Sequence, residues 1–282
     1  EGFGNLTSLT ALDLSNCEGL ERLSSDIGNL QVSTLTLRGC KLLKEIPESF
    51  GELAKLTKLN FYACAALETL PESIGNLTKV TEIDLSQCTA LTSLPTSLGQ
   101  LTNLKKLIMP RTGLTTLSAT ISSLSALEEL DVTGQGGTTG ISGVAADVFS
   151  GLTKLKKLSA SNNSFSGGLS WLKNLSALQT LRLDGNQLSG QLDLSQFGPV
   201  LTDVYLSNNK LEGNLNGIST LTKVRNLYLD HNLLSGELPA ELGNCSTLSY
   251  LYLNDNNITG TIPVEVAKMN LGYSGLKLNG NR

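Results

Sequence analysis

The chain has 282 residues, of which 40% are hydrophobic and 16% charged, and its net charge is −4. This acidic balance argues against a nucleic-acid partner, because nucleic-acid-binding proteins usually present a clustered basic surface. No apolar run approaches the roughly 20 residues that a membrane-spanning helix needs, so no membrane insertion is expected of this segment.

One pattern of leucines, L-x-x-L-x-L-x-x-N/C, recurs twelve times along the chain at intervals of mostly 23–25 residues. Its last position is occupied in turn by Cys17, Cys40, Cys64, Cys88, Thr112, Gln135, Asn163, Asn186, Asn209, Asn232, Asn256 and Asn281. The pattern resembles the leucine-rich-repeat signature. This resemblance implies an α/β solenoid, a horseshoe of about twelve coils. A parallel sheet would form its concave face, and 3-10 or irregular segments its convex face.

The first coil shows how each position is expected to work. Leu12 and Leu14 alternate with polar residues, which is the pattern of a short strand with one buried face. Leu6 and Leu9 are expected to turn inward from the approach to that strand. One coil cannot bury its leucines alone, so neighbouring coils are expected to stack around a continuous core.

The cysteines follow the same repeat. Cys17, Cys40, Cys64 and Cys88 stand where other coils have Asn, and Cys245 fills the first leucine position of its coil. An Asn there is expected to satisfy buried backbone groups, and a small thiol can replace it. A disulfide or metal site is the alternative, but there is no C-x-x-C pair and the spacing equals the repeat length. We therefore expect buried free thiols, with no metal and no cofactor.

The segments between strands change character along the chain. Early coils contain Ile46–Gly51, Leu70–Gly75 and Leu94–Gly99, each with Pro at its second position, which suits a short helical turn on the outer face. Late coils carry Gly190, Gly213, Gly236 and Gly260 at one fixed position. A repeated Gly indicates a backbone conformation that a side chain would hinder.

We interpret the chain as one domain, 1–282, with sub-blocks 1–132 and 144–282 around an irregular glycine-rich repeat at 133–143. That repeat is 28 residues long. It is interpreted as a slack loop after an inserted coil segment; a functional loop or a local change in curvature is the alternative.

The two sub-blocks resemble different plant-type leucine-rich-repeat proteins. The late phrase beginning at Leu234, LSGELPAELGN, is similar to receptor-kinase and receptor-like ectodomains. The early phrase beginning at Leu67, LETLPESIGNLT, is similar to the repeats of intracellular immune receptors. Similar repeats occur in algal and protist surface proteins. The paired-cysteine caps of such ectodomains are missing, so we expect these residues to be part of a longer protein.

The concave face should expose the residue between the two strand leucines of each coil. This central row reads Asp13, Thr36, Asn60, Asp84, Ile108, Asp131, Ser159, Arg182, Tyr205, Tyr228, Tyr252 and Lys277. Tyr and Arg are enriched at binding hot spots, and they cluster in the later coils. The candidate ligand-binding residues are Arg182, Tyr205, Arg225, Tyr228, Asp230, His231, Tyr250 and Tyr252. Cross-strand packing of aromatic side chains is the alternative explanation.

Other polar or aromatic features are weaker candidates. Arg38, Tyr62 and Asp84 form a mixed group in the early coils. The lysines between 154 and 157 are interpreted as a solvated face. Trp171 is expected to be half-buried packing.

No catalytic residues are expected. The lone His231 has Asp230 beside it, but no exposed nucleophile accompanies the pair, and a buried thiol is a poor nucleophile. The resemblance implies a non-catalytic recognition module that binds a protein, a peptide or a glycan on the concave face. The alternative is an intracellular sensor or assembly scaffold. The sequence leaves the oligomeric state open.

Six Asn-x-Ser/Thr sequons favour the cell surface or secretion over the cytoplasm, with candidate sites at Asn5, Asn76, Asn162, Asn174, Asn244 and Asn257. Unpaired cysteines favour the opposite location, because secreted proteins usually pair theirs. We expect the surface location and keep the cytoplasmic one as the alternative.

Overall fold

The computed structural model describes residues 5–6, 8–134, 140–272 and 275–282. It separates into two compact units, Glu1–Ile141 and Ser142–Arg282. The organisation as one domain stays a prediction. The glycine-rich loop interpretation and the ladder position of Gln135 fall largely on residues 135–139, outside the described part.

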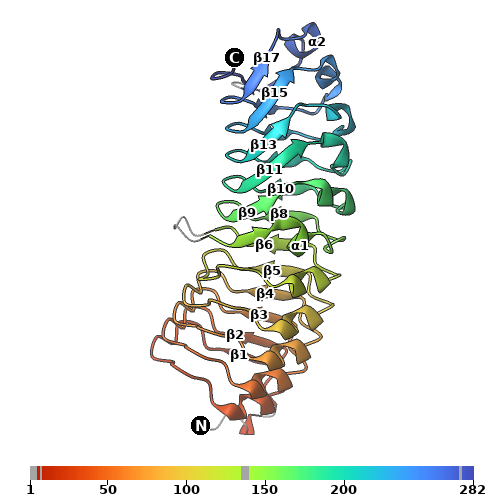
Figure 1. Ribbon diagram of the computed structural model, residues 1–282. Helices are drawn as coiled ribbons and strands as arrows, with labels where there is room; N and C mark the ends of the chain where they lie inside the picture. The colour runs from red at the N-terminus through yellow and green to blue at the C-terminus, as the bar shows by residue number, and fades with distance from the viewer. Residues whose placement is uncertain (1–4, 7, 135–139, 273–274) are drawn as a thin grey trace. The chain divides into compact units, whose positions relative to one another are not determined.

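The first unit is a stack of coils in which one 3-10 helix separates each short strand from the next. Its parallel strands lie in chain order: β1 (Ala11–Asp13), β2 (Thr34–Thr36), β3 (Lys58–Asn60), β4 (Glu82–Asp84), β5 (Lys106–Ile108) and β6 (Glu129–Asp131). The 3-10 helices are η2 (Ser25–Asn29), η3 (Glu48–Glu52), η4 (Glu72–Asn76), η5 (Thr96–Gln100) and η6 (Ala119–Ser123). Equivalent positions pair across neighbours, as Leu12 with Leu35 does. The expected coil is confirmed here (Figure 1).

The second unit carries two parallel sheets. One continues the expected pattern: β8 (Lys157–Ser159), β10 (Thr180–Arg182), β12 (Asp203–Tyr205), β14 (Asn226–Tyr228), β16 (Tyr250–Tyr252) and β18 (Leu276–Lys277). The other contains β7 (Ser142–Val144), β9 (Ser164–Gly167), β11 (Gln187–Leu192), β13 (Lys210–Gly213), β15 (Leu233–Glu237) and β17 (Asn257–Thr259). Its helices are α1 (Ala145–Phe149), η7 (Ser170–Asn174), η8 (Leu194–Gln196), η9 (Ile218–Thr220), η10 (Ala240–Asn244) and α2 (Val264–Ala267).

The second sheet is an addition to the expected solenoid that the repeat pattern did not predict. Its strands fall in the segments with the late glycine pattern (Figure 1). Gly190 has a φ of 87°, and an added Cβ would meet nothing within 4 Å, so the backbone angle alone explains the preference for glycine. In the first unit the reason differs: a Cβ on Gly75 would lie 2.7 Å from the carbonyl oxygen of Ser97, so close coil packing requires glycine there.

An asparagine ladder joins the two sheets of the second unit. The Asn209 amide donates to the carbonyls of Leu183 and Leu206, each at 3.0 Å, and its oxygen accepts the N–H of Leu188 at 3.0 Å. Leu188 belongs to β11 of the second sheet. Each ladder Asn from Asn186 to Asn281 makes the equivalent bonds between its own coil and the preceding one.

The buried ladder cysteines of the first unit make the inter-coil donor bond but, within the described residues, accept no N–H from a second sheet. The Cys64 thiol donates to the carbonyl of Leu37 at 3.1 Å, and Cys88 donates to that of Phe61 at 3.2 Å. These bonds match the inter-coil bonds of the Asn amides, as the sequence predicted. No second-sheet strand occurs among the described residues of this unit, so the ladder residue needs no acceptor for a second-sheet N–H.

The first coil departs from the expected burial. Cys17 is exposed, and Leu6 is 46% exposed, so neither is the buried residue that the pattern predicted. This coil has a neighbour on one side only among the described residues, so its core positions stay half covered. The other four cysteines are buried free thiols, as expected.

The tryptophan also differs from expectation. Trp171 is only 4% exposed, its ring centroid lies 5.5 Å from that of Phe149, and its indole N–H donates to the carbonyl of Gly168 at 3.0 Å. It is a fully packed core residue because α1 supplies an aromatic partner that the repeat pattern did not reveal.

Candidate functional site

The candidate site lies on the exposed face of the β8–β18 sheet. Five residues at equivalent positions of consecutive strands form what we call the tyrosine row: Arg182, Tyr205, Tyr228, Tyr252 and Lys277. The strand residues before the first four are buried leucines or valine that fix the sheet on the core, and Leu276 before Lys277 is half-buried, so the row points away from the core.

Cross-strand register places these side chains in contact. The guanidinium of Arg182 lies 4.5 Å from the centroid of the Tyr205 ring, and that ring lies 4.8 Å from the Tyr228 ring. Tyr228 lies 4.5 Å from Tyr252, whose centroid is 3.9 Å from the ammonium of Lys277. The row is a continuous stack of three aromatic rings with a cation at each end; the first ring pair is tilted by 33° and the second is edge-to-face at 61°. Such cation–π contacts hold long cationic side chains in place.

A charged group borders the row at the carboxyl end of the strands. Nδ1 of His231 lies 2.9 Å from Asp230, and Nε2 lies 3.3 Å from Asp255 of the next coil. His231 and Asp255 both have positive φ, at 54° and 56°, as does the equivalent residue of most coils. That left-handed turn brings side chains of adjacent coils together.

The remaining predicted site residues are less tightly placed. The Tyr250 ring packs at 89° to that of Tyr252, with centroids 6.4 Å apart, so it extends the aromatic surface sideways. Arg225 is exposed immediately before β14, and its side chain makes no hydrogen bond, ion pair or cation–π contact among the described residues. The structure therefore assembles Arg182 and the tyrosines, pairs Asp230 with His231, and leaves Arg225 apart.

The hydroxyl groups of the row are available to a ligand. Burial raises the pKa values of Tyr205 and Tyr228 above the usual one, so both hydroxyls are protonated donors at neutral pH. Within the described part of the chain, no hydrogen bond reaches the hydroxyls of Tyr205, Tyr228 or Tyr252. The contacts also agree with cross-strand packing, so whether these residues bind a ligand stays a prediction.

Two further side chains belong to the site and were not among the predicted residues. Lys277 stands in the central row, and its strand register shows that it closes the stack. Asp255 follows His231 by one repeat length, and that spacing could have indicated the second carboxylate.

The weaker candidate in the first unit is smaller than the tyrosine row. Arg38 lies 4.9 Å from the Tyr62 ring, and the Tyr62 hydroxyl accepts a bond from Gln87 at 3.1 Å. On the same sheet, Lys58 pairs with Glu82 at 2.9 Å. This face consists largely of groups that already have partners.

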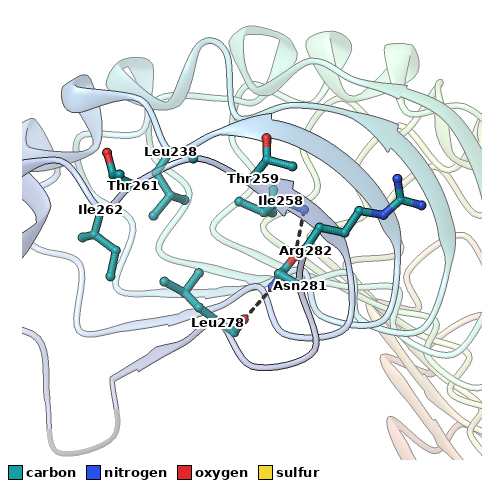
Figure 2. A pocket seen from close by; sticks show the side chains of 9 residues that line it. Leu238, Ile258, Thr259, Thr261, Ile262, Leu278, Asn281 and Arg282 are labelled. Atoms are coloured by element: carbon teal, nitrogen blue, oxygen red, sulfur yellow. Dashed lines mark hydrogen bonds between the residues drawn. The ribbon is translucent and has the colours of Figure 1, made fainter.

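Three hollows in the second unit lie away from the tyrosine row. Figure 2 shows one of them, lined by Ile258 and Leu278 among others and crossed by the ladder bonds of Asn281; its volume is about 170 Å³. Another, about 430 Å³, lies along the second sheet near Glu212 and Arg282, and a third, about 180 Å³, lies near Glu241. None gathers a set of ionisable groups typical of catalysis, and the described residues contain no cluster suited to a metal ion.

The candidate glycosylation sites differ in accessibility. Asn5, Asn76, Asn162, Asn174 and Asn244 are exposed, and Asn257 is half-buried in β17. Exposure permits modification but does not show it.

The stacked coils define a repeat solenoid with an exposed parallel sheet. A profile of the leucine-rich repeat region matches residues 1–198, and a profile of the single leucine-rich repeat matches residues 223–245 and 247–269. The chain belongs to the leucine-rich-repeat family. No curated protein sequence matches it.

Solved structures share the fold. A leucine-rich-repeat protein of Leptospira interrogans is 29% identical with a TM-score of 0.74, over 96% of this chain and 72% of that one. The Arabidopsis receptor kinase HAESA, solved with a peptide hormone and a co-receptor, is 27% identical with a TM-score of 0.69, over 96% of this chain and 48% of its own. A plant ice-binding protein is 27% identical with a TM-score of 0.66, over 79% of this chain and 71% of that one.

These relatives confirm the plant-type leucine-rich-repeat resemblance and the solenoid fold. The chain spans less than half the length of HAESA, and the three proteins differ in what they do, so the shared fold does not decide the function. The family and fold are typical of protein-recognition modules without catalytic activity. Among the described residues, no helix is long and apolar enough to cross a membrane.

Proposed function

We propose that this chain is a non-catalytic recognition module that binds a protein or peptide on the tyrosine row. The observation that carries the proposal is the ordered stack of three tyrosines between two cations on an exposed sheet face. Aromatic and cationic side chains held in place by one another lose little entropy on binding, so they suit a binding hot spot. The peptide bound to HAESA supports this choice of partner class.

The test is a peptide selection on the intact chain followed by affinity measurement. Tyr228→Ala removes the middle ring of the stack and should weaken the selected peptides at least about tenfold, since hot-spot truncations remove about 2 kcal/mol or more and about 1.4 kcal/mol corresponds to tenfold. Tyr62→Ala is the matched control, because Tyr62 is also a half-buried tyrosine beneath an arginine, in the other unit. An unchanged affinity in a folded Tyr228→Ala variant would refute the proposal.

We further propose a cell-surface or secreted location, with an intracellular sensor or scaffold as the alternative. The exposed sequons support the surface location. Likeness to a plant receptor kinase is the second support.

A further inference from the structure

The acidic groups around the tyrosine row already have hydrogen-bond partners. Asp184 accepts a bond from the Ser161 hydroxyl at 2.6 Å, and Asp230 accepts one from Ser207 at 2.6 Å besides its contact with His231. Asp255 contacts His231 and accepts a bond from the side chain of Asn254. Each of these carboxylates therefore already has a partner within the chain.

The two cations of the row lack such partners. Neither Arg182 nor Lys277 makes an ion pair within the described residues, although each stacks on a tyrosine. On the first unit's sheet, by contrast, Lys58 and Lys106 pair with Glu82 and Glu129 at 2.9 and 3.2 Å. A guanidinium that lies over a ring keeps its in-plane N–H donors free, and these match a carboxylate.

We propose that the row binds an extended acidic peptide that crosses the strands, with one carboxylate on Arg182 and a second on Lys277. This inference rests on the proposed function and specifies its ligand. The successive distances of 4.5, 4.8, 4.5 and 3.9 Å place the two cationic groups at most about 18 Å apart. An extended peptide advances roughly 3.3 Å per residue.

That span fixes the spacing of the acidic residues. Side chains on one face of an extended peptide recur at every second residue, so both carboxylates can face the sheet only at an even spacing. Separations of four and six residues cover roughly 13 and 20 Å, and the flexible side chains of the cations and acids absorb the difference. The ligand is therefore a segment with two acidic residues four or six apart.

The tyrosines favour a peptide over a sugar between the two acids. Tyr228 has a ring on each side, at 4.8 and 4.5 Å, so its ring is flanked by aromatic neighbours while its hydroxyl has no hydrogen bond within the described residues. Protonated hydroxyls can donate to the backbone carbonyls of an extended chain.

The experiment selects 12-residue peptides from a random display library on the parent chain and on two variants, Arg182→Gln and Lys277→Gln. We expect the peptides selected on the parent chain to contain pairs of Asp or Glu four or six residues apart more often than pairs five residues apart. Each variant should bind them about tenfold more weakly and lose the enrichment, and raised salt should weaken the parent. Lys210→Gln, at an exposed lysine of β13, is the control and should match the parent.

The outcomes separate this inference from the proposed function. One contrary result is a set of peptides that need Tyr228 for binding but contain no acidic pair; another is a set that keeps the same affinity for Arg182→Gln and Lys277→Gln. Either result would overturn the acidic spacing and leave the proposed recognition function in place. No Tyr228-dependent peptide at all would overturn both. A sulfated dextran that displaces the peptides with equal affinity and the same dependence on both cations would overturn the peptide assignment.

Discussion

The side chain of Asn232 joins two coils through four hydrogen bonds. It donates to the carbonyls of Leu206, Leu229 and Asp230 at 3.0, 3.1 and 3.2 Å, and its oxygen accepts the N–H of Leu211 at 3.0 Å. A single small donor such as a thiol could offer only the inter-coil bond to Leu206, as the buried ladder cysteines do in the first unit. The acceptor for Leu211, at the start of the second sheet, requires the amide oxygen.

Replacing Asn232 should therefore show a graded loss of stability. Asn232→Ala leaves buried backbone groups unpaired and should lower the free energy of unfolding by roughly 3 kcal/mol. Asn232→Cys keeps a donor for Leu206 but no acceptor for Leu211, so its loss should be about half as large. Urea unfolding followed by Trp171 fluorescence measures both, because Trp171 is buried in the same unit.

Asn279→Ala is the control for this pair, since the Asn279 side chain is exposed and makes no hydrogen bond within the described residues. Its effect should stay within about 0.5 kcal/mol. Equal losses in Asn232→Cys and Asn232→Ala would show that the amide oxygen, not the inter-coil donor, carries the stabilisation.

At the scale of elements, the first unit links its 3-10 helices through carboxylates. Both oxygens of Glu72 in η4 accept backbone N–H groups at the start of η5, from Thr96 and Ser97, each at 3.0 Å. Glu48 in η3 binds the start of η4 in the same way. The bonds to Ser97 and then Thr96 lower the pKa of Glu72 below its usual 4.5.

This lowered pKa gives a defined pH dependence. A carboxylate whose pKa is lower in the folded state stabilises the fold above the unfolded value, and that stabilisation disappears as the pH falls through 4.5 to the folded pKa. Glu72→Gln should lower the thermal midpoint at pH 7, and the gap from the parent should close in acid. Thermal unfolding at pH 7, 5 and 3 measures it. Glu68→Gln, at an exposed side chain, should show no such convergence; a pH-independent gap would contradict the mechanism.

The first sheet could be predicted from sequence and the second could not. The positions of Leu12 and Leu14 carry an apolar residue in every coil, and this alternation specifies a strand. The strands of the second sheet contain a glycine, as β11 does at Gly190, and glycine is depleted in strands. These strands form because the ladder amide of the next coil binds them, and that contact is not visible in local sequence.

For the molecule as a whole, the tyrosine row follows from repeat arithmetic, because equal spacing places Tyr205, Tyr228 and Tyr252 at one register. The contact between His231 and Asp255 depends on left-handed turns in two coils, so the sequence alone did not predict it and the structure was needed to find it. The burial of the cysteines was predictable except at Cys17, where coverage depends on what flanks the coil.

The location of the protein can be tested on its sequon asparagines and its cysteines. If the chain passes through the secretory pathway, N-glycosidase should lower the intact mass of protein purified from its natural source, because five of the six sequon asparagines are exposed. The buried cysteines should stay reduced there. Burial raises the pKa values of Cys64 and Cys88 to about 12, so neither thiol forms the reactive thiolate at physiological pH.

Thiol labelling completes this test. In the native state only Cys17 should react with an alkylating reagent, and all five thiols should react after denaturation. A glycosidase shift together with one accessible thiol would fit a surface receptor whose ladder cysteines are protected by packing. An unchanged mass would contradict the surface location and favour the intracellular scaffold, because exposed sequons would then never have met the glycosylation machinery.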